Sequence, residues 1–323
     1  MDRNETIISF VGLRNITQLV ILYDYYFQGI VVEETRADNP RIMKNYPSNK
    51  IIVVQNSYIK ILNPNLSVDL IIPIYNVEYL EVFPDGKFVI VIKRKLIVYD
   101  SEGNILVQLI GHTDSINCVM IIKDKIVSGS SDNTVRIWNL QGDCEAILGG
   151  HAEPIIHLDQ LSDGTIVSGD EDNTIRIWGT PHIINNFYWE LGIMFCILPD
   201  DRIVYCSSST NVEIWSPKGA YSINDDEKVR FIFLEENKIF INRGIITTIL
   251  NSQNFKVIER IFTREGGEIS ILPNQQLVFR FGNRLQILDS TPIKTIHIPN
   301  KKVLILNDGR VAVANSDEIL ILK

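Results

Sequence analysis

Short apolar stretches separated by polar turn residues recur along the whole chain. In a representative pair, the apolar residues 88–92 and 96–99 are joined by the polar residues 93–95. Near-continuous apolar runs of this length are typical of β-strands buried on both faces. No segment shows the 3.6-residue apolar period over the length that a helix requires. The pattern therefore predicts an all-β chain.

A turn of similar composition precedes each of these strand pairs. It consists of an apolar residue followed by Pro, Asp, Asn or Gly, each of which favours turns for a physical reason. The turn occurs at residues 46–50, 83–87, 122–125, 161–165, 198–202, 234–238, 272–276 and 306–310. The spacing, roughly 34 to 40 residues, is close to the period of propeller blades. We expect about eight repeating units, with seven as the alternative if one unit is irregular.

The stretch from Gly111 to Trp178 contains one pattern twice. Each copy has Gly-His, then Ser-Gly, a turn ending in Asp-Asn-Thr, and a β-branched strand that ends in Trp. The copies are Gly111-His112 with residues 128–138, and Gly150-His151 with residues 168–178. With a period of about 40 residues, this pattern resembles the WD-repeat family. The period extends over most of the chain, whereas the full motif is present only in these two copies.

This resemblance implies a β-propeller of four-stranded antiparallel blades, with a hydrogen-bonded tetrad of side chains in each complete blade. The two tetrads would be His112, Ser128, Asp132 and Trp138, and His151, Ser168, Asp172 and Trp178. Residue chemistry agrees, because Trp only donates, a carboxylate only accepts, and Ser and His do both. The alternative is a Ser-His-Asp nucleophile. We favour the structural role, since the strand and turn pattern already accounts for every member.

The two ends of the chain bear on how the propeller is completed. The last unit contains three expected strands, from residue 303 onward, and lacks a fourth. An open edge invites aggregation, so an N-terminal strand is expected to close the ring, and residues 29–34 are the best-phased candidate. We therefore expect a single propeller domain over residues 28–323. Residues 1–27 are expected to form a hairpin or a partial extra blade.

Composition narrows the classes of function. The net charge of −8 argues against a nucleic-acid or anionic-membrane surface. The cysteines show no paired spacing, and no leader or apolar run of membrane-spanning length is evident, which favours a soluble cytoplasmic protein. Three histidines outside the tetrads, His157, His182 and His297, are scattered. We therefore expect no metal, no cofactor and no catalytic residue.

The resemblance implies a non-catalytic scaffold that presents loops to a protein or peptide partner. The family positions for such contacts correspond here to Asp114, Ser115, Ser131, Glu153, Pro154 and Glu171. Several are acidic, so a basic or polar partner segment is expected. The alternatives are an adaptor that binds substrate or ubiquitin in ubiquitin transfer and, less favoured, a propeller hydrolase. The Ile- and Asn-rich composition resembles that of AT-rich genomes such as those of giant viruses and some protists.

Overall fold

The computed structural model describes most of the chain from residue 42 onward. The described residues are 7–8, 33–36, 42–55, 57–172, 174–185, 195–206, 210–216, 219–223, 229, 231–235, 238–242, 246–262, 268–271, 277–281, 284–288, 294–297, 302–306, 311–314 and 318–322. They contain β-strands and no helix. The prediction of an all-β chain is confirmed.

The described residues form eight sheets, in which strands consecutive in the chain are antiparallel neighbours. The first four sheets comprise β3 (Ile42–Tyr46), β4 (Lys50–Val54), β5 (Tyr58–Leu62) and β6 (Val68–Pro73); β7 (Tyr79–Val82), β8 (Phe88–Ile92), β9 (Lys95–Tyr99) and β10 (Ile105–Ile110); β11 (Ile116–Ile122), β12 (Lys125–Ser130), β13 (Thr134–Trp138) and β14 (Cys144–Gly149); and β15 (Ile155–Gln160), β16 (Ile166–Asp170), β17 (Thr174–Ile177) and β18 (Ile183–Asn185).

The remaining sheets follow the same order. They comprise β19 (Phe195–Ile197), β20 (Ile203–Cys206), β21 (Val212–Ser216) and β22 (Gly219–Ile223); β23 (Phe231–Glu235), β24 (Lys238–Asn242), β25 (Ile246–Asn251) and β26 (Val257–Phe262); β27 (Glu268–Ile271), β28 (Leu277–Phe281), β29 (Arg284–Leu288) and β30 (Lys294–His297); and β31 (Lys302–Ile305), β32 (Val311–Ala314) and β33 (Glu318–Leu322).

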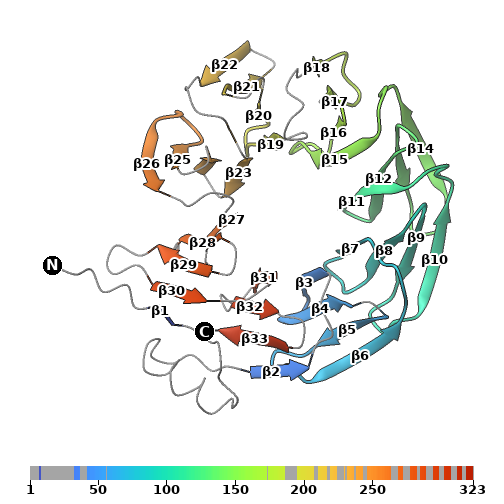
Figure 1. Ribbon diagram of the computed structural model, residues 1–323. Helices are drawn as coiled ribbons and strands as arrows, with labels where there is room; N and C mark the ends of the chain where they lie inside the picture. The colour runs from blue at the N-terminus through green and yellow to red at the C-terminus, as the bar shows by residue number, and fades with distance from the viewer. Residues whose placement is uncertain are drawn as a thin grey trace.

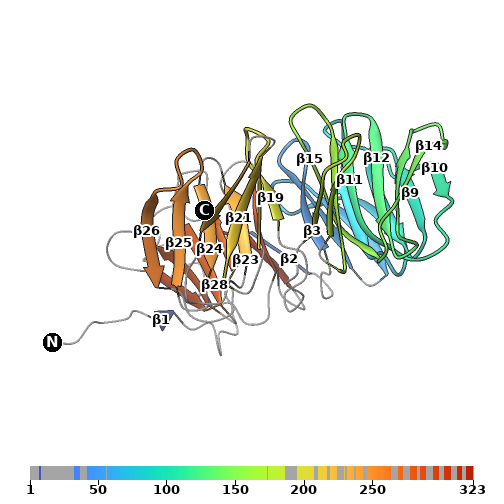
Figure 2. The same ribbon diagram turned by 90° about the horizontal axis from the view of Figure 1, so that it is seen from above.

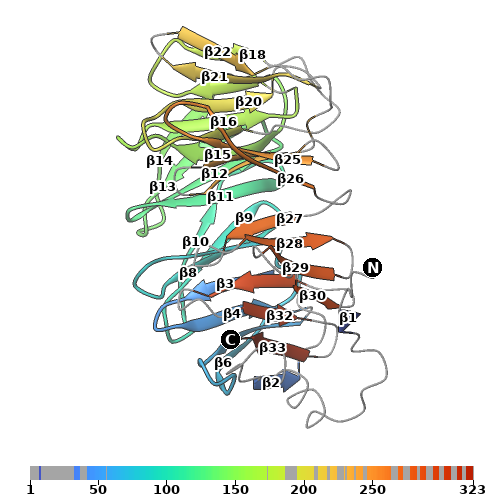
Figure 3. The same ribbon diagram turned by 90° about the vertical axis from the view of Figure 1, so that its left-hand side faces the viewer.

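The sheets are arranged around a common centre as the blades of a β-propeller (Figure 1). The first strand of a blade, such as β11 or β15, lies nearest the centre, and the last, such as β10 or β14, lies at the rim. Figures 2 and 3 show the same disc edge-on, and in Figure 2 strands such as β11 and β12 run from one face of the disc to the other. The two ends of every first strand therefore lie toward opposite faces of the disc.

Turn residues connect the first and second strands as the sequence predicts. At residues 83–87, Gly86 N–H donates to Phe83 O at 3.0 Å, and Lys87 N–H donates to Asp85 Oδ1 at 3.1 Å. Gly86 has a φ of +90°, a conformation that glycine adopts without steric cost. The turn at residues 161–165 repeats this arrangement, with Gly164 N–H donating to Leu161 O at 2.9 Å.

The core is divided into apolar layers between neighbouring blades. In β8, Phe88 and Ile90 pack toward the preceding blade, whereas Val89 and Val91 pack toward the following one. Alternate side chains of a strand point to opposite faces, so a blade with a neighbour on each side requires apolar residues at every position. This explains the near-continuous apolar runs. In the blade of β23 to β26, Leu250 holds the position of the motif Trp, because it pairs with Ile239 as Trp138 pairs with Ile126, and it packs in an apolar cluster with the preceding blade.

The first and last blades are in contact. Leu306, directly after β31, and Ala312 of β32 share one buried cluster with Met43 and Ile51 of the first blade. The last blade gains a fourth strand from β2 (Glu33–Arg36), which pairs antiparallel with β33 and places Glu33 opposite Ile321. Of the predicted closing segment 29–34, only residues 33 and 34 are described. That the disc closes with eight blades stays a prediction.

Residues 1–27 were expected to form a hairpin or a partial blade. Within them the structure describes β1 (Ile7–Ile8), which pairs parallel with β30, with Ile7 opposite Thr295. The rest of this segment lies outside the described residues, so its arrangement stays a prediction.

Candidate interaction site

The structure brings His112, Ser128, Asp132 and Trp138 together in one hydrogen-bonded chain. Trp138 Nε1–H donates to Ser128 Oγ at 2.9 Å. Ser128 Oγ lies 2.8 Å from His112 Nε2, and His112 Nδ1 lies 2.7 Å from Asp132 Oδ2. Because the carboxylate only accepts, Nδ1 carries the proton and Nε2 accepts from the Ser128 hydroxyl. Every polar atom along this chain has a partner.

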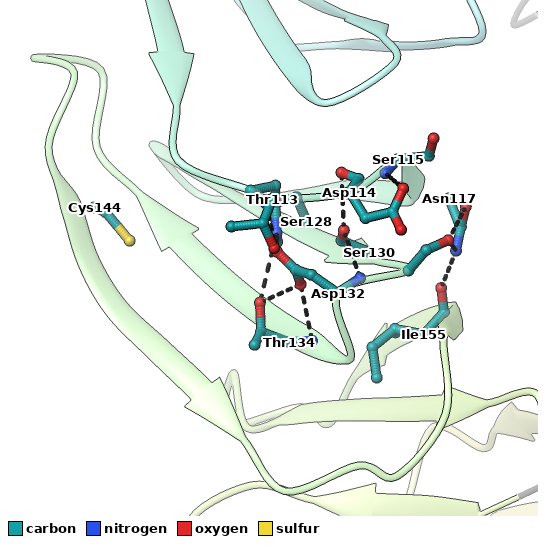
Figure 4. Close-up of polar contacts among 12 residues, drawn as sticks. Thr113, Asp114, Ser115, Asn117, Ser128, Ser130, Asp132, Thr134, Cys144 and Ile155 are labelled. Atoms are coloured by element: carbon teal, nitrogen blue, oxygen red, sulfur yellow. Dashed lines mark hydrogen bonds and ion pairs between the residues drawn. The ribbon is translucent and has the colours of Figure 1, made fainter.

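The network fixes the protonation states of its members. Burial lowers the pKa of His112 and outweighs the opposing influence of Asp132, so the ring is neutral at pH 7. Burial alone would raise the pKa of Asp132, but hydrogen bonds from Thr134, His112 and the Thr113 N–H outweigh it and lower the pKa to about 2. Figure 4 shows how Thr113 and Thr134 approach this carboxylate. A neutral imidazole and a charged carboxylate thus stabilise the turn together.

The second repeat forms the same network with a different acid. Trp178 Nε1–H donates to Ser168 Oγ at 2.7 Å, and Ser168 Oγ lies 2.7 Å from His151 Nε2. The partner of His151 Nδ1 is Asp170, whose Oδ2 lies 2.7 Å away. The predicted member, Asp172, is exposed. The prediction of Asp172 was therefore wrong.

Geometry explains the choice of Asp170. This residue ends β16 and is 1% exposed, directly beside the buried imidazole of His151. Its second oxygen, Oδ1, accepts the Thr174 N–H at 2.8 Å, which is the role that Asp132 plays toward Thr134 in the first repeat. One carboxylate thereby satisfies both the histidine and the turn. Asp172 is left in solvent, where a charged group loses no hydration.

Two glycines of the motif are required by close packing. A Cβ on Gly111 would lie 2.6 Å from Arg136 Nη1 and 2.9 Å from Trp138 Cη2. A Cβ on Gly129, in the Ser-Gly dipeptide, would lie 2.5 Å from Ile155 Cγ2 of the next blade. The Gly-His and Ser-Gly dipeptides therefore let the tetrad and the neighbouring blade approach closely.

The order carboxylate, imidazole and hydroxyl also occurs in nucleophilic triads, but here both serine hydroxyls are buried inside their blades. Ser128 and Ser168 are both 0% exposed, and each hydroxyl already receives an indole N–H. A nucleophile must approach substrate with a free lone pair and space for the attacked group. The burial of both tetrads supports a structural role.

The six predicted contact residues lie together in pairs on one face of the disc. Ser131 N–H donates to Ser115 O at 2.8 Å, and Glu171 N–H donates to Pro154 O at 3.0 Å. Each pair thus joins the start of a first strand to the turn between the second and third strands. Asp114, Ser115 and Glu171 are exposed, whereas Ser131, Glu153 and Pro154 are half-buried. We call these six residues the upper face.

Side chains outside the six predicted contact residues connect and border this face. Asn117 Nδ2–H donates to Ser131 Oγ at 2.9 Å and to Ile155 O of the next blade at 3.0 Å (Figure 4). Ile116 N–H donates to Lys93 O at 2.8 Å, which places the exposed turn of Lys93 and Arg94 beside the start of β11. In the sequence, Lys93 and Arg94 occupy the turn between the second and third strands of their unit, the same position that Ser131 occupies in the next unit. The upper face therefore has a basic border.

Two of the three histidines outside the tetrads pack against aromatic rings. His157 packs edge-on against Phe195, with 4.4 Å between ring centroids, and His182 packs against Trp215 at 5.3 Å. His297 lies in β30. All four cysteines, Cys118, Cys144, Cys196 and Cys206, are free thiols. In the part of the chain that the structure describes, no three His, Cys, Asp or Glu side chains are grouped as metal ligands.

Comparison with known proteins identifies the repeats. The family model "WD domain, G-beta repeat" matches residues 103–139 and 142–179. A ribosome biogenesis protein WDR12 homolog of Nematostella vectensis is 37% identical over 89 residues, covering 28% of this chain and 17% of that protein. The WD repeat-containing protein pop1 of Schizosaccharomyces pombe is 30% identical over 76 residues, covering 23% and 10%. The chain thus matches less than a fifth of the length of these relatives.

A solved structure shares the fold. The crystal structure of the computationally designed Ika8 protein superposes with a TM-score of 0.72 at 16% identity, covering 88% of this chain and 96% of that one. The blades and the two tetrads define a β-propeller of the WD type. Residues 103–179 contain two repeats of this family, and in them the chain is similar to divergent WD-repeat proteins. WD repeats generally mediate protein–protein interactions in non-catalytic scaffolds. Within the described residues, no helix is both long and apolar enough to span a membrane.

Proposed function

We propose that this chain is a non-catalytic scaffold that presents the upper face to a basic or polar segment of a protein partner. The observation that carries this proposal is the repeated pairing of Ser115 with Ser131 and of Pro154 with Glu171, which aligns equivalent loops of adjacent blades. A rigid disc holds such loops in place without ordering them at each binding event, which lowers the entropic cost of association.

Charge on the upper face favours a cationic segment. Asp114, Glu153 and Glu171 form no ion pair with other described residues, so no neighbouring cation of the described structure neutralises their charges. The basic border of Lys93 and Arg94 lies on the side of β11 away from Glu153. A segment with basic residues over the second repeat and an acidic or neutral end over Lys93 would match this distribution.

The four free cysteines are consistent with a reducing compartment, and a cytoplasmic location is part of the proposal. A closed ring of eight blades is also part of it, supported by the shared cluster of Ile51 with Leu306 and by the pairing of β2 with β33. A closed ring leaves the loops, and not the sheet edges, as the surface for partners.

Charge reversal on the upper face tests the proposal. Peptides selected from a random displayed library against the wild-type chain provide the probe. The double substitution Glu153→Lys with Glu171→Lys is expected to reduce their association rate at low salt by about tenfold and to weaken its salt dependence. Glu102→Lys is the matched control, because Glu102 is exposed on the opposite face. If the control slowed association equally, or the double variant not at all, the upper face would be excluded.

A further inference from the structure

A second surface feature lies on the opposite face of the disc. Three consecutive turns, which follow β11, β15 and β19, enclose a pocket of about 440 Å³. We call this the turn pocket, and the residues that matter for its chemistry are Ile122, Lys123, Asp159, Leu161, Ile197 and Pro199. The six-residue strand β15 begins next to Pro154 of the upper face and ends at the pocket. Such a strand spans about 20 Å, so the two surfaces are separate.

Asp159 is the carboxylate of the turn pocket that is not used by a turn. Asp201 accepts from the Ser162 N–H and from the Ser162 hydroxyl, both at 2.6 Å, and Asp163 accepts from the Thr165 N–H at 2.8 Å. Asp159 accepts only from the N–H of its own neighbour Gln160, at 2.7 Å, among the hydrogen bonds of the described residues. Two acids thus maintain the loops, and one remains open to a ligand.

Apolar side chains line the turn pocket beside Asp159, and Lys123, the cation among the lining residues, does not pair with it within the described structure. Asp159 lies on the same side of β15 as His157, whose ring packs against Phe195, so the carboxylate faces the neighbouring blade. Burial raises the pKa of Asp159, and the Gln160 N–H and His157 lower it less. Lys123 is exposed and forms no ion pair with Asp159 within the described structure. A bound cation would offset the cost of burying this charge.

The walls of the turn pocket suit a side chain with an apolar stem and a cationic head. Ile122, Leu161, Ile197 and Pro199 supply apolar surface around the carboxylate. Arginine buries its methylene stem against such surface while the guanidinium reaches an acid, and it is less strongly hydrated than lysine. The volume falls within the range of ligand sites and exceeds what one arginine fills, so an adjoining apolar residue also fits.

We propose that the turn pocket binds an arginine side chain of a partner polypeptide, with the guanidinium paired to Asp159 and a neighbouring apolar residue packed on Leu161 and Ile197. The fit rests on charge complementarity with Asp159 and on the apolar walls. It does not depend on the function proposed for the upper face.

Calorimetric titration of the full chain with the peptide acetyl-Ala-Leu-Arg-Leu-Ala-amide tests this proposal. The analogue with citrulline, which keeps the shape of arginine without the charge, is expected to bind about tenfold more weakly, and the lysine analogue several-fold more weakly. The wild-type chain is used for this comparison, so it holds whatever the variants do. Equal binding of the citrulline peptide, or no binding of the arginine peptide at millimolar concentration, would overturn the proposal.

The Asp159→Asn variant locates the binding site. This substitution should lower the affinity for the arginine peptide by about tenfold and abolish the preference for arginine over citrulline. Asp124→Asn is the matched control, because Asp124 is an exposed acid in the turn at residues 122–125 but does not line the pocket. The Glu153→Lys and Glu171→Lys double variant should bind the peptide as the wild type does. Unchanged binding by Asp159→Asn, or loss of binding in the double variant, would contradict the assignment.

Discussion

His151 Nδ1 lies 2.7 Å from Asp170 Oδ2, so the second repeat completes its tetrad with an acid two residues before the one that its alignment with the first repeat predicts. In the first repeat, the position equivalent to Asp170 is Ser130, whose hydroxyl donates to Asp114 O and accepts the Asp132 N–H. The two repeats therefore share one network while distributing its acceptors differently.

The two acids of the second repeat are expected to differ in their contribution to stability. Asp170→Ala leaves the buried His151 N–H and the Thr174 N–H without their acceptor and should lower the free energy of unfolding by about 2 to 4 kcal/mol. Asp172→Ala removes an exposed side chain and should change the free energy of unfolding by less than about 0.5 kcal/mol. Denaturant titrations measure both. A larger loss from Asp172→Ala would restore the assignment made from the sequence.

Stability should fall as the pH drops below about 6.5, the ordinary pKa of histidine. Burial lowers the pKa values of His112, His151 and His157 in the folded chain. The unfolded chain therefore binds protons first as the pH falls, and each proton taken up there favours unfolding. The contribution of these three histidines to the free energy of unfolding is fully present above pH 6.5. It is lost as the pH falls toward their pKa values in the folded chain.

Unfolding free energies measured from pH 8 to pH 5 test this dependence. His157→Leu should reduce the slope below pH 6.5, since it removes one of the three groups and keeps an apolar contact with Phe195. Asp132 contributes in a separate window, because its folded pKa of about 2 lies below its ordinary value and the contribution is lost only below about pH 4. A flat profile between pH 7.5 and pH 5.5 would contradict neutral buried histidines.

Local patterns predicted most of the fold because strands and turns depend on nearby residues. The turn at residues 83–87 contains Pro, Asp and Gly in the order that its hydrogen bonds require, and residues 88–92 form β8 as expected. The position of β2 in the fold was harder to predict from the sequence. Its pairing partner β33 lies at the other end of the chain, and the sequence Glu-Glu-Thr-Arg of β2 has no alternation of apolar and polar residues that would fix the register.

The candidate sites also depend on contacts between blades, which the local sequence does not predict. The upper face follows from motif positions, but the basic border of Lys93 and Arg94 depends on how two blades meet. The turn pocket depends on three blades. Most of its residues lie in turns that the sequence predicts, but no local pattern shows that these three turns meet. Asp170 could not be chosen over Asp172 from the sequence, because both lie within reach of the same turn and only burial distinguishes them.

Close packing between blades makes Gly129→Ala a sensitive test of the interface between the first and second repeats. The added Cβ would lie 2.5 Å from Ile155 Cγ2 of the next blade and 2.7 Å from Cys118 Sγ of the neighbouring strand β11, so both contacts must relax. Overpacking of this kind costs about 1 to 3 kcal/mol of unfolding free energy. Gly149→Ala is the control, because its added Cβ meets no atom within 4 Å. Equal stability of the two variants would show that the blades are less closely packed than the structure indicates.

Deletion of residues 1–36 tests whether the N-terminal strand completes the disc. It removes β2 and leaves the backbone groups of β33 unpaired along an open edge. An open edge pairs readily with other chains, so the shortened chain should melt at a lower temperature and self-associate as its concentration rises. Sedimentation velocity over a range of concentrations measures this. Deletion of residues 1–6, which keeps both β1 and β2, is the control and should remain like the full chain. If the chain lacking residues 1–36 stayed monomeric with an unchanged melting temperature, β2 would not be the closing strand.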